Sequence, residues 1–152
     1  MVRAMVMGAK TRTRRLKCLG EPGDRLWVRE QWGWEGETKW SDIAPDGMFW
    51  YASDCLVDGM GPSKWQPSIH MPYRAKRYEI ELEDVWEEPC NQITEYEAVE
   101  EGMLTLFGLP GFKWATEEMS ARTIFQRYIK SLNPKHDVWN SNVFAHKIKW
   151  LL

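Results

Sequence analysis

Apolar and polar residues alternate in several stretches of the chain, with the two-residue period of a β-strand. In residues 77–85, Tyr78, Ile80 and Leu82 share one face and glutamates occupy the other, as in an antiparallel strand with one wet face. Residues 143–151 alternate in the same way and predict a terminal strand of the kind that closes a sheet or barrel. Shorter strands are expected over residues 25–32 and 48–52.

Two longer helical patterns are visible. Thr94-Glu95-Tyr96-Glu97 is a capping box, and Gly102 supplies a left-handed end, so a short helix is expected over residues 95–101. Between residues 116 and 132, apolar side chains fall on one helical stripe, and Asn133-Pro134 ends the pattern. This second stretch is therefore predicted to be the main helix of the protein.

Other stretches interrupt these patterns. Residues 33–63 and 103–118 contain glycines, prolines and small polar residues, and they are predicted to be insertions. Residues 64–72 hold two prolines and are expected to form a kinked segment at a sheet edge. Because strands occur in runs with helices set to one side, the pattern predicts an α+β fold with an antiparallel sheet. The length of 152 residues suits one domain, which we expect over residues 1–152.

Composition limits where the protein is expected to act. No apolar run approaches the roughly 20 residues that span a bilayer, and no signal-peptide pattern follows the first basic residues. Cys18, Cys55 and Cys90 are odd in number and far apart, which argues against a disulfide framework or a Cys-x-x-Cys metal site. His136 and His146 lack metal-ligand spacing. We therefore expect a cytoplasmic protein with no membrane partner, no cofactor and no bound metal.

The net charge of −2 hides an uneven distribution. Residues 1–76 carry 12 basic and 9 acidic side chains (+3), whereas residues 77–152 carry 8 and 13 (−5). Five of the eight residues from Lys10 to Lys17 are basic, and they follow a short helix expected over Met1–Met7 and ended by Gly8. Such a block attracts phosphate groups. By charge alone, a solvated surface loop is the favoured interpretation.

The ten tryptophans are a second outlier in the composition. Large aromatic side chains suit the half-buried faces of strands, and they also stack on nucleobases. Most of the tryptophans are therefore predicted to pack in the core. One or two near the basic segment could instead form a platform for a base.

Four segments, in this order along the chain, resemble ASCH domains, and especially the small ASCH proteins encoded by phages and prophages. They are Gly8–Arg15 (GAKTRTRR), Pro22–Glu30 (PGDRLWVRE), Trp65–Pro72 (WQPSIHMP) and the positions Ile93-Thr94-Glu95, Ala98 and Glu101-Gly102. Trp139-Asn140-Ser141-Asn142, followed by a strand, is similar too. The resemblance spans almost the whole chain, and the joint order and spacing of the segments carry it.

The resemblance implies a PUA-like fold, a small β-barrel of mostly antiparallel strands with flanking helices. It also implies a cleft for RNA or a nucleoside, because some similar proteins are amidohydrolases that deacetylate N4-acetylcytidine. Their loop pattern is Lys-Thr-x-Thr-x-Arg, in which the lysine and the second threonine are catalytic, together with a glutamate near the end of the following helix. By resemblance, Lys10, Thr13 and Glu101 are the candidate catalytic residues, and Arg15 completes the loop pattern.

The chemistry of these residue types agrees with a hydrolytic site. A threonine hydroxyl becomes a nucleophile when a neighbouring base takes its proton, and a lysine is such a base when burial or nearby cations lower its pKa. Glu101 could then orient Lys10 or assist proton transfer. The alternative is an anion-binding turn in which Thr13 and Arg15 hold a phosphate and Glu101 forms only a salt bridge. The sequence leaves both interpretations open.

The leading expectation is a protein that acts on RNA or a modified nucleoside, as a monomer or a weak homodimer. The alternatives are a non-catalytic RNA-binding module, a ribonuclease, and a phage accessory protein that binds a host protein. His70 could act as a general base, but a packed residue bonded to a carbonyl is the more common case. The candidates for contacts with substrate or nucleic acid are Thr11, Arg12, Arg14, Arg15, Trp65, His70 and Arg74.

Overall fold

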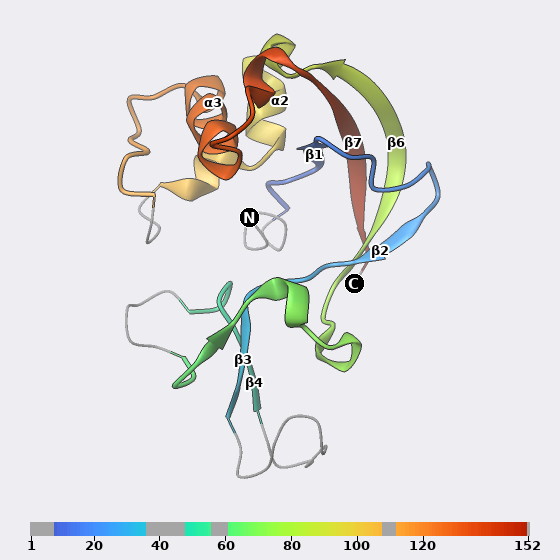
Figure 1. Cartoon of the computed structure of the whole chain (residues 1–152), viewed down its shortest axis with the longest axis vertical. Coiled ribbons are helices and arrows are strands. Elements are labelled where there is room, and N and C mark those ends of the chain that lie inside the picture. Colours follow the sequence, from blue (N-terminus) through green and yellow to red (C-terminus); the bar gives the residue numbers. More distant parts are fainter. Residues whose placement is uncertain (1–7, 36–47, 56–60, 108–111, 152) are drawn as a thin grey trace. The chain divides into compact units, whose positions relative to one another are not determined.

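The computed structural model describes residues 8–35, 48–55, 61–107 and 112–151. The chain forms two compact units (Figure 1). Unit 1 consists of the described parts of Arg3–Leu26 and Ile80–Leu152, and unit 2 of the described parts of Trp27–Glu79. The single domain expected over residues 1–152 stays a prediction. The architecture is mixed α/β with antiparallel sheets, as the strand and helix patterns predict.

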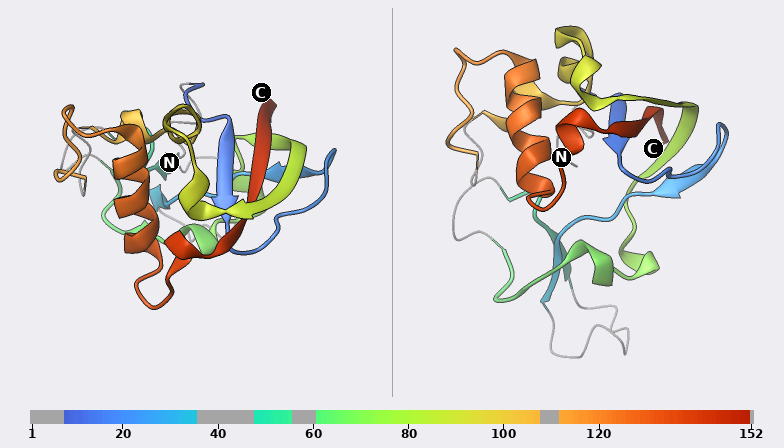
Figure 2. Two further views of the ribbon diagram at one scale, coloured as in Figure 1. Left: turned by 90° about the horizontal axis from the view of Figure 1, so that it is seen from above. Right: turned by 45° about the horizontal axis from the view of Figure 1, so that its top comes forward.

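A four-stranded sheet contains the long strands of the chain. Its order is β1 (Arg12–Arg15), β7 (Asn142–Leu151), β6 (Glu79–Pro89) and β2 (Arg25–Trp27). β1 runs antiparallel to β7, with Thr13 opposite His146. β6 and β7 curve along their length (Figures 1 and 2). This four-stranded sheet and the three-stranded sheet of unit 2 contain all the described strands. The described strands form no closed barrel.

Two helices pack side by side in unit 1, α2 (Glu95–Glu100) and α3 (Ala121–Leu132) (Figure 1). The capping box predicted for α2 is confirmed, and Gly102 follows the helix in the left-handed conformation with φ of 80°. The apolar stripe of α3 is confirmed at Ala121, Ile124, Phe125 and Ile129, which are buried in the core of unit 1. Tyr128 packs against that core, whereas Leu132 is exposed.

The main helix starts later than the apolar pattern predicts. α3 begins at Ala121 instead of residue 116, because Ser120 accepts a hydrogen bond from the Thr123 amide and caps the helix. The carboxylate of Glu95, on α2, accepts from the backbone amides of Ala121 (2.5 Å) and Arg122 (3.1 Å). A contact between two helices therefore fixes this helix start.

Three strand predictions need correction. β2 ends at Trp27 and β3 begins at Trp32, so the single strand expected over residues 25–32 is wrong beyond Trp27. In the irregular segment between the two strands, Glu30 is buried and forms an ion pair with Arg77 at 2.9 Å. β6 extends to Pro89, beyond the predicted end at residue 85. β7 lies between β1 and β6, so it is an inner strand instead of one that closes a sheet.

Unit 2 contains a three-stranded sheet in the order β4 (Met48–Tyr51), β3 (Trp32–Glu35) and β5 (Trp65–Gln66). The predicted strand at 48–52 and the predicted edge position of residues 64–72 are confirmed. Two short 3-10 helices follow, over Ser68–His70 and Tyr73–Ala75. The core of unit 2 is aromatic, with Trp32, Met71 and Ala75 buried beneath other rings.

Some predictions fall on parts of the chain outside the described residues. These are the helix over residues 1–7 and the central parts of the insertions predicted near 33–63 and 103–118. In the described part of the second insertion, Met103–Leu106 forms a 3-10 helix with both end residues fully buried. In the described parts of the chain, no helix has the length and apolar character needed to cross a membrane.

Candidate functional site

Residues 10–14 of the basic segment are buried or half-buried, so the solvated loop expected from charge alone is wrong there, whereas Arg15 and Lys17 are exposed. Lys10 and Arg14 are each 1% exposed and Thr13 is 3% exposed. Pairing of β1 with β7 accounts for this burial on one side, and α2 covers the other. Burial of the charged Lys10 and Arg14 side chains is costly unless oppositely charged partners lie beside them.

Carboxylates supply most of those partners. Lys10, Arg12 and Arg14 face four glutamates from β6 and from α2 and its end, and we call these seven residues the charge cluster. The cluster holds three cations and four carboxylates, so its formal net charge is −1. The four glutamates are Glu88, Glu97, Glu100 and Glu101.

The pair at the centre of the charge cluster is Lys10 and Glu101. Lys10 Nζ lies 2.6 Å from Glu101 Oε2, and it also donates to the Glu101 backbone carbonyl at 3.1 Å. Backbone contacts fix the pair, because Lys10 and Glu101 form a β-bridge and the Thr11 amide donates to the Glu100 carbonyl at 2.8 Å. Two of the predicted catalytic residues thus meet, although they lie 91 positions apart in the sequence.

The two arginines hold the other carboxylates. Arg14 Nε donates to Glu88 at 2.7 Å, and Arg14 Nη1 reaches Glu101 Oε1 at 3.3 Å. Arg12 Nη1 donates to Glu97 at 2.9 Å, and its guanidinium lies 5.4 Å from the ring centroid of Trp86. These arginines are therefore neutralised inside the protein and present little charge to an external phosphate.

Thr13 lies on the face of β1 opposite Arg12 and Arg14, as alternation along a strand requires. Its Oγ1 is buried and has no hydrogen-bond partner within the described part of the chain, so no hydrogen bond joins Thr13 to Lys10 there. The Thr13 backbone carbonyl is 3.2 Å from Nδ1 of the fully buried His146. A buried hydroxyl without a partner is uncommon and costs stability unless a ligand or water satisfies it.

Burial also sets the proton affinity of Lys10. Removal of the ammonium group from water lowers the pKa of Lys10 below its usual value, and the charges of Arg15 and Arg14 act in the same direction. Glu101 opposes the shift without reversing it. For Glu97, partial burial raises the pKa, but hydrogen bonds from Thr94 and the charges of Arg14 and Arg12 outweigh this and leave it lowered. A lysine with a lowered pKa is suited to accept a proton.

The remaining candidate residues are distributed differently. Thr11 Oγ1 lies 3.4 Å from Glu100, at the edge of the charge cluster, and Arg15 is exposed at the end of β1. Trp65, His70 and Arg74 belong to unit 2, where Trp65 is half-buried and the other two are exposed. In the described residues, no group of three or more His, Cys, Asp or Glu side chains is arranged to hold a metal ion.

The tryptophans are mainly packing residues. Of the nine within the described residues, Trp32 and Trp139 are buried in the two cores and the other seven are half-buried. Three of these seven, Trp27, Trp34 and Trp114, pack against a core. Trp86, which lies beside Arg12, is half-buried. A stacking platform of exposed tryptophans is therefore absent from the part of the chain that the structure describes.

Several residues of the site carry no signal in the sequence. Glu88 lies in an acidic strand, where glutamates are common on the face toward water, so its sequence context does not mark it as a site residue. Glu97 already has a local role in the capping box of α2. Glu88 contacts Arg14 across 74 positions of the sequence, and Glu97 contacts Arg12 across 85 positions. His146 pairs with Thr13 across a distance of 133 positions. Only the folded chain reveals these contacts.

Comparisons of the chain with models of protein families, with curated proteins and with solved structures found no match.

Proposed function

We propose that this protein hydrolyses the amide of an N4-acylated cytidine, with Lys10, Thr13 and Glu101 as its catalytic residues. The proposal includes a PUA-like arrangement of the strands, as the resemblance to ASCH domains implies. Its main support is the buried Lys10–Glu101 pair at 2.6 Å beside a strand in which the Thr13 hydroxyl is buried without a partner.

Each residue has a defined role in the proposed reaction. Thr13 Oγ1 adds to the acyl carbon, and its proton passes through water to the amine of Lys10, which reacts in its uncharged form. The carbon–nitrogen bond then breaks, and the departing cytidine amino group takes a proton from Lys10. Water hydrolyses the resulting threonine ester, which releases the carboxylic acid and restores the hydroxyl. Glu101 holds the Lys10 amine in position through these steps.

A purely structural interpretation of the same residues makes different predictions. The Lys10–Glu101 pair also connects β1 to the end of α2, and buried ion pairs often serve only to position elements. In that case replacement of Lys10 lowers stability but affects no reaction. Activity and stability must therefore be measured on the same variants.

The test is release of acetate from N4-acetylcytidine by the purified full chain. We expect release by the wild type, and a loss of about 100-fold or more in kcat for Thr13→Ala, because it removes the nucleophile. Lys10→Met should lose activity to a similar extent under conditions in which circular dichroism shows that it is folded. Lys149→Met and Thr116→Ala are matched controls, because both residues are exposed and lie outside the site.

Two outcomes would overturn the proposal. The first is no acetate release by the wild-type protein. The second is unchanged release by folded Thr13→Ala and Lys10→Met. If Thr13→Ser retained activity while Thr13→Val lost it, the hydroxyl itself would be implicated, because valine has nearly the same shape as threonine.

The non-catalytic RNA-binding alternative receives less support from the structure. Arg12 and Arg14 already form ion pairs with glutamates, which leaves the exposed Arg15 and Lys17 as the cations of this segment that face water. Few phosphate contacts give a shallow dependence of affinity on salt. RNA affinity that falls steeply with salt, and that Arg14→Ala weakens, would favour this alternative over hydrolysis. Ribonuclease activity and binding to a host protein stay predictions.

A further inference from the structure

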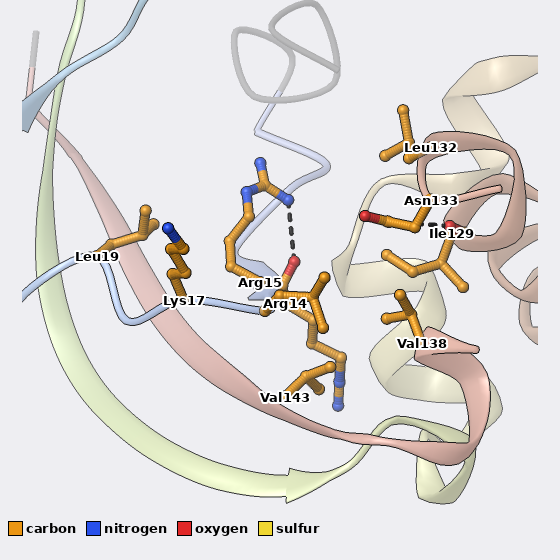
Figure 3. A pocket seen from close by; sticks show the side chains of 10 residues that line it. Arg14, Arg15, Lys17, Leu19, Ile129, Leu132, Asn133, Val138 and Val143 are labelled. Carbon is orange, nitrogen blue, oxygen red and sulfur yellow. Dashed lines mark hydrogen bonds between the residues drawn. The ribbon is translucent and has the colours of Figure 1, made fainter. Parts of the chain in front are cut away.

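A pocket of about 390 Å³ opens in unit 1 on a part of β1 that the proposed reaction does not use (Figure 3). One wall is formed by the end of β1 and the segment that follows it, and the other by the end of α3 and the start of β7. Lys10, Thr13 and Glu101 are not among its lining residues. Its volume falls in the range of about 300–1,000 Å³ that is common for small-molecule sites.

Aliphatic side chains form most of the lining. Ile129, Val138 and Val143 are buried at the wall of the pocket, and the more exposed members close its rim. Leu16, Leu19 and Leu132 retain 42%, 39% and 52% of their exposure, so three large apolar side chains face water around one opening. Exposed apolar surface concentrated at a concave site is typical of ligand binding.

Two cations at the same opening, Arg15 and Lys17, have no acidic partner among the residues that the structure describes. Arg15 donates to the Arg14 backbone carbonyl at 2.9 Å, and neither Arg15 nor Lys17 forms an ion pair within the described residues. This differs from the neighbouring Arg12 and Arg14, whose guanidinium groups are held by glutamates. The two cations are therefore available to an anion outside the protein.

Asn133 adds a polar group on the opposite wall. Its Nδ2 donates to the Ile129 carbonyl at 3.1 Å, which leaves the side-chain oxygen as an acceptor. Figure 3 shows this oxygen directed toward the side of the pocket where Arg15 lies. The pocket thus combines an aliphatic interior with a cationic entrance and few other polar groups.

We infer that this pocket binds a small molecule with an apolar body and a single carboxylate, such as a medium-chain fatty acid. The apolar body lies against Leu132, Val138 and Val143, and the carboxylate lies between Arg15 and Lys17. A nucleotide fits this lining less well, because its sugar and base carry polar groups that the aliphatic side chains leave unsatisfied.

The experiment titrates the full ¹⁵N-labelled chain with decanoate, with decanol and with uridine 5′-monophosphate, below the micelle concentration of the decanoate. We expect decanoate to shift the backbone resonances of Lys17, Leu19 and Asn133, and to bind at least several-fold more tightly than decanol. Lys17→Ala should weaken decanoate binding by about two- to fivefold, the range for loss of an exposed charge contact. Leu132→Gln should weaken it by about threefold or more, because it removes apolar contact area.

Two controls match these variants. Lys149→Ala removes an exposed lysine and Leu104→Gln removes a leucine that is 43% exposed, and both residues lie outside the pocket lining. Neither should change decanoate affinity. The inference is overturned if decanoate does not bind, if decanol binds equally well, or if the nucleotide binds more tightly. Equal effects of the control and pocket variants would also overturn it. Acetate release from N4-acetylcytidine tests the proposed function separately, so either idea can fail alone.

Discussion

At the scale of single residues, burial of charge dominates unit 1. The side chains of Lys10, Arg14 and Glu101 are almost completely removed from water, and each of them has an oppositely charged partner within 3.3 Å. An isolated charge in such a place would be costly, whereas a paired and hydrogen-bonded charge is tolerated. The stability of β1 should therefore depend on keeping these charges balanced.

Replacement of one partner tests this balance. Lys10→Met should lower the free energy of unfolding by about 3–5 kcal/mol, because it removes the nearer of the two cations beside the buried Glu101 carboxylate and leaves only Arg14, at 3.3 Å. The double variant Lys10→Met/Glu101→Gln should recover much of this loss, since Arg14 keeps its bond to Glu88. Urea unfolding of both variants and of Lys149→Met provides the comparison. A double variant less stable than Lys10→Met would contradict the explanation.

His146 should make stability depend on pH. Its Nε2 accepts from the Leu19 amide at 3.1 Å, so Nδ1 carries the proton and donates to the Thr13 carbonyl. A second proton on Nε2 would place two donors against each other. Burial lowers the pKa of His146 below its ordinary value, and Arg15 acts in the same direction, although hydrogen bonds to the Thr13 and Phe144 carbonyls oppose this.

The sign of the effect follows from the lowered pKa. At pH values between the folded and the unfolded pKa of His146, the unfolded chain binds more protons, so folding loses stability as the pH falls. The contribution is complete above about pH 6.5, the ordinary histidine pKa, and decreases below it. Urea midpoints at pH 5.5 and 7.5 should differ more for the wild type than for His146→Gln. The exposed His136 provides the control variant His136→Gln, which should retain the wild-type difference.

At the scale of elements, contacts between distant segments decide where several of them begin and end. β7 illustrates the point, because its buried side changes along its length. Val143 and Ala145 are buried on one face and His146 and Ile148 on the other, so both faces are covered near the middle of the strand. An inner position between β1 and β6 is consistent with this pattern.

The start of α3 gives a test at this scale. Ser120→Ala should lower the free energy of unfolding by about 1 kcal/mol, the usual value of an N-cap side chain. Glu95→Gln should lower it as well, because a neutral amide is a weaker acceptor for the Ala121 and Arg122 amides. Urea unfolding measures both effects.

The exposed Thr116, which lies inside the predicted helix but outside the observed one, gives the control variant Thr116→Ala. It should leave the unfolding midpoint unchanged. Equal destabilisation by Thr116→Ala and Ser120→Ala would place the helix start where the sequence pattern puts it and not at Ala121.

At the scale of the whole molecule, each of the two units has its own core. Thirteen buried residues form the main cluster of unit 1, whereas the aromatic cluster of unit 2 contains three fully buried members among the described residues. The free energy gained on folding increases with buried apolar area. Unit 2 should therefore open more readily than unit 1.

Hydrogen exchange detected by mass spectrometry tests this difference. Amides of β3 and β4 should exchange faster than those of α3 and β7, because local opening of unit 2 costs less free energy. Trp32→Ala should accelerate exchange mainly in the β3 and β4 peptides, since Trp32 lies in the core of unit 2. Equal exchange rates in both units, or equal acceleration by this variant, would show that the chain opens as one cooperative body.

The sequence by itself determined the local features of this protein. The capping box of α2, the left-handed Gly102, the apolar stripe of α3 and the alternation in β6 all appear where their patterns place them. These features depend on residues a few positions apart, whose preferences act within one turn or along one strand. The resemblance of Lys10 and Glu101 to catalytic positions also rested on sequence, and in the structure these two residues form an ion pair.

Only the tertiary structure decided how the basic segment is used. Five cations in eight residues indicated a solvated loop, yet Lys10, Arg12 and Arg14 are paired with glutamates 74 to 91 positions away. Charge in a sequence does not show which opposite charges will lie beside it after folding, and burial follows from those long-range contacts. The same contacts separate the neutralised cations from Arg15 and Lys17, which remain available at the pocket.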